Sequence, residues 1–202
     1  MAGAEFLEFM RSRRSVRRFY PEAVPSEILD SIIDTALCAP SAHNRQPWRF
    51  AVVQVSSKKA RLADCMGAEF RLDLQQDGLS QADVDAQVER SQRRIMEAPV
   101  VIVLCLDPSE LDEYPDPVRC QAEHTMAVQS VAMAGGVLML AAHAYGLGSV
   151  WMCAPLFAPS AVVKALDLPP TWEPQGMVLA GYPARIPEPR PRRPLSEVAR
   201  YL

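Results

Sequence analysis

Two short segments in the first quarter of the chain hold the side chains best suited to binding a flat, anionic molecule. Arg13-Arg14-Ser15-Val16-Arg17-Arg18 places four guanidinium groups and one hydroxyl within six residues, and planar guanidinium groups pair well with a doubly charged phosphate. The second segment is Ala39-Pro40-Ser41-Ala42-His43-Asn44-Arg45-Gln46-Pro47-Trp48, whose prolines disfavour regular helix. Its Ser41, Asn44 and Gln46 side chains are therefore free to hydrogen-bond to the polar edge of a planar ring.

Each segment also has a purely structural interpretation. The arginines could complement the C-terminal dipole of a helix that ends nearby and stay solvated. Asn44 could hydrogen-bond to the backbone of a turn instead of to a ligand. The occurrence of both segments in one chain favours the ligand site.

Other kinds of chemical site find little support. His43, His124 and His143 are scattered, without the spacing of metal ligands, so no metal is expected. His143 is expected to be a hydrogen-bonded core residue, and His124 either a polar anchor or a substrate contact. Gly146-Leu147-Gly148-Ser149 is not a dinucleotide fingerprint, because it follows an expected helix and enters an expected strand; its glycines would allow backbone close to a flat ligand. No signature of covalent catalysis is present.

Composition indicates a single globular domain over 1–202. The 202 residues are 49% hydrophobic and 22% charged, enough to bury a core. The net charge of -3 argues against a nucleic-acid partner. Five widely spaced cysteines without a Cys-x-x-Cys pair fit reduced thiols in the cytoplasm, and Met1–Met10 has no apolar run typical of a signal peptide.

The segment Met126–Tyr145 is almost wholly apolar but contains Gln129, Ser130 and His143 and is rich in alanine and glycine. A helix that is apolar all round is buried either in lipid or in protein. The polar and small residues favour a central protein helix, close to a subunit interface, over a membrane span.

Hydrophobic periodicity and turn residues predict an α+β fold with one central sheet flanked by helices. Strands are expected at 48–55, 100–106, 150–153 and 176–181. Helices are expected at 5–11, 26–37 with Ser26 as N-cap, 58–66, 121–144 and 160–166, and another is expected to begin after Ser80. The polar segment 66–97 is expected to be a mobile lid. The proline-rich segment 183–202 is expected to be an extended arm that reaches a neighbouring subunit.

The chemistry-bearing residues resemble the nitroreductase family of FMN-dependent oxidoreductases. The specific parts are Arg13-Arg14-Ser15-x-Arg17, Pro40-Ser41-x-x-Asn44-x-Gln46-Pro47-Trp48, Gly146-Leu147-Gly148-Ser149-x-Trp151 and Gly181-Tyr182-Pro183. The likeness extends from Arg13 to the arm. It implies a mixed or antiparallel sheet flanked by helices, and an obligate homodimer with two FMN sites at its interface and the arm crossing to the partner.

The same resemblance implies roles for individual residues. Arg13, Arg14, Ser15 and Arg17 would hold the FMN phosphate and one end of the ring. Ser41, Asn44 and Gln46 would come from the other subunit, and Arg190 or Arg192 would close over the phosphate. Backbone N–H groups of Leu147, Gly148 and Ser149, or of the segment around Met152, would meet the flavin N5. Hydride would leave N5 directly for the acceptor, so no side chain is expected to be catalytic.

A narrower likeness concerns Phe70-Arg71-Leu72-Asp73-Leu74-x-x-Asp77-Gly78-Leu79, Tyr114-Pro115-Asp116, Ala122-Glu123-His124-Thr125-Met126 and Leu168-Pro169-x-x-Trp172-Glu173-Pro174. These segments are similar to the C-terminal domain of the bifunctional coenzyme F-420 glutamate ligase. That likeness implies reduction of a conjugated double bond in a dehydro precursor of coenzyme F-420, with Arg61, Arg71 and His124 as substrate contacts. Two alternatives stay open: an NAD(P)H-dependent reductase of nitroaromatics or quinones, and a non-catalytic protein that binds flavin or deazaflavin.

Overall fold

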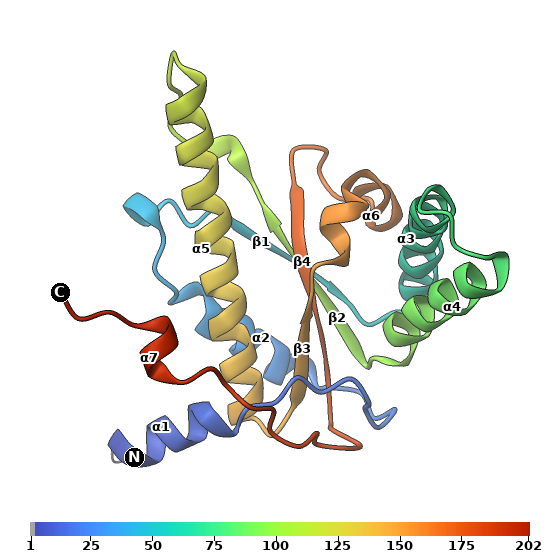
Figure 1. The fold of residues 1–202 in the computed structure, drawn as a ribbon, viewed down its shortest axis with the longest axis horizontal. Helices are drawn as coiled ribbons and strands as arrows, with labels where there is room; N and C mark the ends of the chain where they lie inside the picture. Colours follow the sequence, from blue (N-terminus) through green and yellow to red (C-terminus); the bar gives the residue numbers. More distant parts are fainter. Residues whose placement is uncertain (1–2) are drawn as a thin grey trace.

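The computed structural model describes residues 3–202 and contains one four-stranded sheet covered by helices on both faces (Figure 1). The elements follow along the chain as α1 (Gly3–Ser12), α2 (Ser26–Leu37), η1 (Ala42–Asn44), β1 (Trp48–Val53), α3 (Ser56–Gln76), α4 (Gln81–Glu97), β2 (Val100–Leu106), η2 (Pro108–Glu110), α5 (Pro117–Ala144), β3 (Gly148–Met152), η3 (Ala154–Phe157), α6 (Pro159–Leu166), β4 (Glu173–Gly181) and α7 (Leu195–Val198). The α+β prediction is confirmed, and the four strands predicted are the four described.

The sheet has the strand order β1-β2-β4-β3, and every neighbouring pair is antiparallel. Trp48 at the start of β1 lies opposite Leu106, and Leu106 lies opposite Glu173 at the start of β4. Gly148 at the start of β3 lies opposite Gly181, at the end of the sheet where Val100 also lies. The loop before β1 and the turn before β3 therefore enter the sheet from opposite ends.

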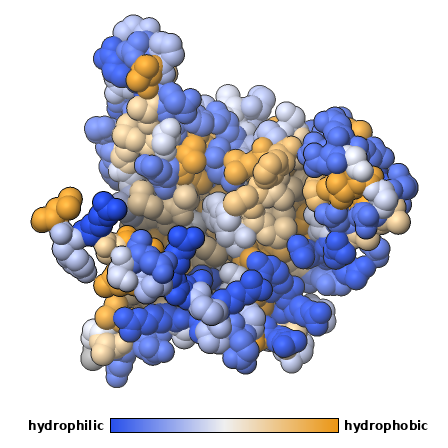
Figure 2. Space-filling view, viewed as in Figure 1, coloured by the Kyte–Doolittle hydropathy of each residue, from blue (hydrophilic) through white to orange (hydrophobic). Residues whose placement is uncertain are grey.

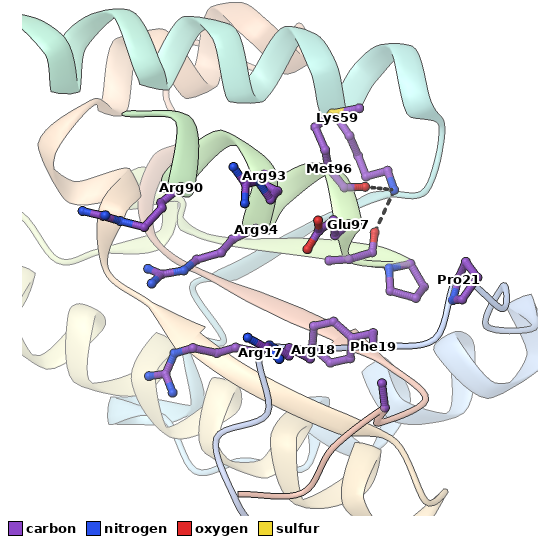
Figure 3. Close-up of a pocket in the computed structure, with 13 residues that line it drawn as sticks. Arg17, Arg18, Phe19, Pro21, Lys59, Arg90, Arg93, Arg94, Met96 and Glu97 are labelled. Carbon is purple, nitrogen blue, oxygen red and sulfur yellow. Dashed lines mark hydrogen bonds between the residues drawn. The ribbon is translucent and has the colours of Figure 1, made fainter. Parts of the chain in front are cut away.

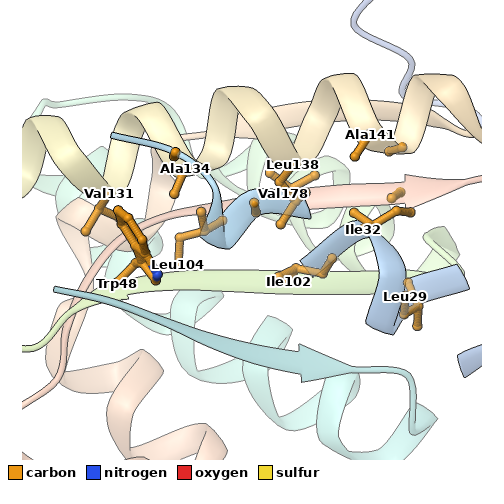
Figure 4. Close-up of a cluster of buried hydrophobic side chains, with 14 of the residues drawn as sticks. Leu29, Ile32, Trp48, Ile102, Leu104, Val131, Ala134, Leu138, Ala141 and Val178 are labelled. Carbon is orange, nitrogen blue, oxygen red and sulfur yellow. The ribbon is translucent and has the colours of Figure 1, made fainter. Parts of the chain in front are cut away.

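Strand β2 shows why the sheet needs helices on both faces. All seven of its residues are buried, and alternate side chains point to opposite faces. Ile102 and Leu104 belong to the cluster under α5 and α2 (Figure 4), whereas Val101 and Val103 belong to the cluster that includes residues of α3 and α6. A continuous apolar run, predicted as a buried strand, thus becomes the middle of a three-layer packing.

Helix α5 crosses one face of the sheet over 28 residues (Figure 1). It is long and apolar enough to pass a length and composition test for a membrane span, and 44% of its most apolar window is buried inside the protein. Its Val131, Ala134 and Leu138 pack in the core, as expected for the central helix. The five cysteines are free thiols, and burial raises the pKa of the Cys105 thiol to about 12.

Several helix boundaries differ from the prediction. Ser26 is the first residue of α2, and the N-cap position is taken by Pro25 without a side-chain cap, so the expected Ser26 cap is wrong. Ser80 does cap α4, accepting from the Asp83 N–H. Helix α3 continues past the expected end at residue 66 as far as Gln76. The expected lid, 66–97, is therefore the second half of α3 plus α4, a hairpin with its own small apolar cluster.

The edge strand β3 is tied to its neighbours by Trp151. A Cβ atom built on Gly135 of α5 would lie 2.2 Å from the Trp151 ring, and one built on Gly176 of β4 would lie 2.4 Å from it. The indole therefore fits only because both neighbours lack a side chain. Its N–H donates to the Cys153 sulfur at 3.2 Å.

Candidate functional site

The arginine segment lies against the outer edge of β3. After α1 ends at Ser12, the Val16 N–H donates to the Ser149 carbonyl at 3.0 Å, and Ser15 pairs with Ser149 as a short parallel bridge. Val16 is 3% exposed, and side chains alternate in extended backbone. Burial of Val16 therefore turns its neighbours Ser15 and Arg17 the other way, into an open cavity.

That cavity has a volume of about 560 Å³ and is strongly basic. Its wall combines the N-terminal segment, α4 and the C-terminal arm, through Arg13, Arg14, Ser15, Arg17, Arg94, Pro187, Glu188, Arg190 and Arg192. The structure thus brings together all six residues predicted to hold a phosphate, and it does so within one chain. Sequence reasoning missed Arg94, although Arg90, Arg93 and Arg94 share a helical spacing that could have revealed it.

The arm reaches this cavity through backbone contacts with the segment beside the arginines. The Tyr20 N–H donates to the Tyr182 carbonyl at 2.9 Å, and the Ala184 N–H donates to the Arg18 carbonyl at 3.0 Å. The arm then runs on to α7 (Figure 1). Farther along the arm, Arg190 and Arg192 line the same cavity as the N-terminal arginines.

One guanidinium nitrogen in the cavity wall has no partner in the described part of the chain. The Arg13 Nη1 atom is buried and makes no hydrogen bond, whereas Arg14 Nη1 donates to the Arg11 carbonyl at 2.6 Å. A buried charged donor left unpaired is costly, so its presence points to an anion as the missing acceptor. The donor set, with the Ser15 hydroxyl beside it, fits a phosphate monoester such as that of FMN.

In the turn before β3, fewer backbone N–H groups are free to donate to a flavin than expected. The Leu147 N–H already donates to the Ala142 carbonyl at 3.0 Å and closes the end of α5, so a flavin nitrogen would need another donor. A Cβ atom on Gly148 would lie 2.7 Å from Val16, so this glycine makes room for a side chain of the protein itself. The close approach of a flat ligand to the Gly148 backbone stays a prediction. Ser149 is 2% exposed, whereas Met152 is half-buried.

The amide-bearing loop before β1 has an unusual backbone. His43, Asn44 and Gln46 all have positive φ, at 51°, 54° and 49°, and such residues cluster at functional sites. The Ser41 hydroxyl closes the loop by accepting from the Gln46 N–H at 3.1 Å. The Asn44 and Gln46 side chains remain exposed, and the Gln46 amide nitrogen makes only a long hydrogen bond, to the Asn44 carbonyl at 3.5 Å.

Ion pairs and hydrogen bonds fix this loop to the protein body. Arg45 pairs with Asp112, and the Ala42 N–H donates to the Ser130 hydroxyl at 3.3 Å. Arg49 lies 3.0 Å from Asp107. Burial alone would raise the pKa of Asp107, but hydrogen bonds from Ser109 and the Arg49 charge outweigh it, and the pKa is lowered. The loop is therefore held in its strained form by charged anchors on both sides.

The loop and the arginine cavity lie far apart in one chain. They enter the sheet from opposite ends, on the two outer strands β1 and β3. The seven residues of β2 span roughly 20 Å, and three strand spacings add about 14 Å sideways. Ser41, Asn44 and Gln46 are thus not brought together with Arg13 and Arg17 within a single copy.

The three predicted substrate contacts are not brought together either. Arg61 lies 2.9 Å from Asp167, Arg71 pairs with Asp85, and His124 Nε2 lies 2.7 Å from Glu173. Hydrogen bonds from Lys58 and Arg61 lower the pKa of Asp167. Arg61 and Arg71 are on α3, whereas His124 is on α5 across the sheet. Each side chain is thus engaged locally in this structure, and the role of the three as substrate contacts stays a prediction.

Comparison with known proteins identifies the family of the chain. The model of the nitroreductase family matches residues 10–182. The chain is 33% identical over 210 residues to a protein of Thermus thermophilus named NADH dehydrogenase, covering 92% of this chain and 90% of the relative. It is 29% identical over 185 residues to a protein of Methanothermobacter thermautotrophicus provisionally named NADH dehydrogenase/NAD(P)H nitroreductase, covering 91% and 80%.

A solved structure gives the same answer for the fold. A protein of Desulfovibrio desulfuricans, crystallised in complex with FMN and described provisionally as a nitroreductase, superposes with a TM-score of 0.73 at 27% identity. The match covers 96% of this chain and 94% of the other. With the family model matched over most of its length, the chain belongs to the nitroreductase family.

Proposed function

We propose that this protein is an FMN-dependent reductase of the nitroreductase type that takes electrons from NAD(P)H and passes them to a small organic acceptor. The observation that carries the proposal is the basic cavity with the unpartnered Arg13 Nη1 atom. The names of the relatives and the FMN in the related crystal structure support the same class of enzyme.

The residues that line the cavity have different roles in binding the cofactor. Arg13, Arg14 and Arg17 provide fixed positive charge for the phosphate, and the Ser15 hydroxyl adds a hydrogen bond. Arg190 and Arg192 close the opposite wall from the arm. When bound, FMN supplies two-electron redox chemistry. The protein then has to position the ring, limit water and place a cation near the ring edge that becomes negative on reduction, the role we assign to Arg17.

We further propose that the working unit is a homodimer, in which the loop containing Asn44 and Gln46 completes the site of the partner. The opposite placement of the loop and the cavity supports this arrangement, since a ring held by the loop would lie far from the arginines of the same copy. A closed dimer presents each patch twice, so two equivalent sites form.

Exposed apolar helices also support a dimer. Helix α1 has no buried residue, and its Phe6 and Leu7 are 48% and 46% exposed. Leu195 and Val198 of α7 are 63% and 62% exposed. Figure 2 shows apolar side chains among hydrophilic ones at the left of the molecule, where α1, α7 and the C-terminus lie. A ten-residue helix with an uncovered apolar stripe gains most of its stability from packing, and a second copy would provide it.

The test is anaerobic mixing of FMN-saturated protein with NADH or NADPH, followed by the flavin absorbance. We expect the flavin band to bleach and to return when a nitroaromatic or quinone is added. Arg13→Gln protein at equal concentration, with its lower FMN content measured, is the matched control. Stable FMN binding with neither bleaching nor reoxidation would overturn the proposal and favour a flavin-binding protein without turnover.

Reduction of a dehydro precursor of coenzyme F-420 is a second candidate for the acceptor. Four segments that resemble the corresponding domain support it, and so does a second arginine-lined cleft beside the cofactor cavity, which suits an acceptor with phosphate or carboxylate groups. Mixing the reduced holoprotein with the dehydro compound should reoxidise the flavin if this acceptor is correct. Reoxidation by quinones alone would remove it.

A further inference from the structure

A second, larger cleft lies beside the cofactor cavity, between the C-terminal half of α4 and the chain that follows the arginine segment (Figure 3). Its volume is about 810 Å³. Its charged lining consists of five arginines, one lysine and one glutamate: Arg17, Arg18, Arg90, Arg93, Arg94, Lys59 and Glu97. The cleft is therefore strongly basic, as is the cavity assigned to the cofactor phosphate.

Most of these cations have no carboxylate partner. Among residues 3–202, Arg93 pairs with Glu89 at 2.6 Å, while no ion pair involves Arg18, Arg90 or Arg94. Like charges held close together repel, and the repulsion is relieved when an anion binds between them. Unneutralised arginines facing a hollow are the arrangement used to bind phosphate.

The walls of the cleft are held in place by backbone-directed contacts. Lys59 is 7% exposed, and its ammonium group donates to the Met96 and Ala98 carbonyls at 3.2 and 2.7 Å, as Figure 3 shows. This lysine fixes the end of α4 and is not free to meet a ligand. On the opposite wall, the Arg18 carbonyl accepts from the Ala184 N–H at 3.0 Å, so the Arg18 guanidinium extends from an anchored backbone.

The cleft and the cofactor cavity share Arg17 and Arg94 as a common wall. Together the two hollows are lined by nine arginines against Glu97 and Glu188: Arg13, Arg14, Arg17, Arg18, Arg90, Arg93, Arg94, Arg190 and Arg192. A single phosphate monoester carries at most two negative charges. One bound cofactor phosphate therefore leaves most of this charge without a counter-ion, and the excess is on the side of the larger cleft.

We propose that the larger cleft is a second oxyanion site, which binds the phosphate group of the soluble molecule that exchanges hydride with the cofactor. The proposal rests on the proposed function for the identity of that molecule, but the anion site itself does not. Either a phosphorylated dinucleotide donor or a phosphorylated acceptor presents the required group, and both would be drawn toward the cofactor by the shared Arg17 and Arg94.

Inorganic pyrophosphate is the probe, titrated calorimetrically into FMN-saturated protein at 150 mM salt, where loosely attracted ions are screened. We expect saturable binding of about one pyrophosphate per chain. The Arg18→Gln/Arg90→Gln variant, whose changed residues line only the larger cleft, should bind at least about tenfold more weakly and keep its FMN content. Arg119→Gln, a surface arginine paired with Asp116, should match the wild type.

If pyrophosphate binding did not saturate, or if the double variant bound it with equal affinity, the arginines of the larger cleft would only be solvated surface charges. Either result would overturn the proposed oxyanion site. Steady-state kinetics then identify the source of the phosphate. Pyrophosphate should compete with NADPH, NADH or a phosphorylated acceptor, and the double variant should raise KM for that same substrate with little change in kcat. Competition with none of them would overturn the assignment to a reaction partner. Pyrophosphate binding in a holoprotein that transfers no hydride would instead reject the proposed function alone.

Discussion

The main-chain N–H of Val16 donates to the carbonyl of Ser149 across 3.0 Å, so the arginine segment is joined to the edge of the sheet as a short additional strand. The side chain of Val16 fills the space above Gly148, where a Cβ atom would approach it to 2.7 Å. The position of the arginines that we propose to bind the phosphate, relative to β3, thus depends on the absence of a single methyl group.

Gly148→Ala should therefore disturb the site without touching an arginine. The added methyl forces Val16 or the backbone to move, and overpacking of this kind costs about 1–3 kcal/mol. Chemical denaturation should show this loss, and FMN titration should show weaker binding. Gly136→Ala is the control, because no atom lies within 4 Å of its added Cβ and alanine stabilises a helix by about 0.5–1 kcal/mol relative to glycine. Equal stability of the two variants would contradict the packing argument.

Arg13→Gln should lower FMN affinity while leaving the empty protein as stable as before or more so. The buried Arg13 Nη1 atom has no partner in the described residues, so no hydrogen bond of that atom is lost in the ligand-free chain. A charge-assisted hydrogen bond contributes about 1.5–3 kcal/mol, which is roughly tenfold or more in Kd. Thermal unfolding with and without FMN measures both quantities. Arg11→Gln, on the exposed end of α1, is the control and should bind FMN normally.

The sequence predicts single elements better than their neighbours in space. The apolar run 100–106, the Ser80 cap and the long helix up to Ala144 are local patterns, and each is confirmed. Helix α3 was expected to end ten residues early because its second half packs mainly on α4 and carries many exposed polar residues. Arg94 was missed because its place beside Arg13 follows from the way α4 returns to the sheet, which no local pattern records.

The order of the strands in the sheet is likewise not recorded in any local sequence pattern. The order β1-β2-β4-β3 puts the first and third strands at opposite edges of the sheet. The arginine segment beside β3 and the amide-bearing loop before β1 therefore lie far apart, although the residue types of both suit one ligand. Residue types near Asn44 and Arg13 predict a flat, anionic ligand, and the family resemblance identifies it as FMN. The distance between them depends on strand pairs whose partner residues lie between 25 and 80 positions apart in the sequence.

His143 should make stability depend on pH. Its Nε2 lies 2.8 Å from the Ser12 hydroxyl, and its ring stacks on Phe9 at 4.8 Å. Burial, aided by the positive charges of Arg13 and Arg14, lowers the pKa of His143 below its usual value of 6.5. The unfolded chain then binds more protons just below pH 6.5, so the stabilisation present above that pH is lost as the pH falls toward the folded pKa.

Urea denaturation of wild type and His143→Gln at pH 7.5 and 5.5 measures this effect. The wild type should lose more unfolding free energy on acidification than the variant, because all other titrating groups are common to both. The opposite order would mean that the folded protein favours the protonated ring.

Two substitutions of Asn44 distinguish the effect of its strained backbone from the effect of its side-chain amide. At a φ of 54°, Asn44→Gly removes the side chain without strain, whereas Asn44→Ala adds about 1 kcal/mol of strain. Both variants should weaken FMN binding, by roughly three- to tenfold for one lost hydrogen bond, and only the alanine variant should unfold at lower urea. Wild-type FMN affinity in Asn44→Gly would remove this amide from the site.

A heterodimer of two variant chains tests whether each FMN site contains residues from both subunits. If Arg13 of one chain and Asn44 of the other meet the same FMN, a heterodimer of Arg13→Gln and Asn44→Gly chains collects both changes in one site and leaves the second site intact. Such heterodimers, isolated with two different affinity tags, should bind about one FMN per dimer with wild-type affinity, although each parent homodimer binds weakly. If both residues served a site within one chain, every site in the heterodimer would carry one defect and no tight binding would return. Because neither variant removes a buried apolar group, misfolding offers no alternative route to the second result, and thermal unfolding of the heterodimer verifies that directly.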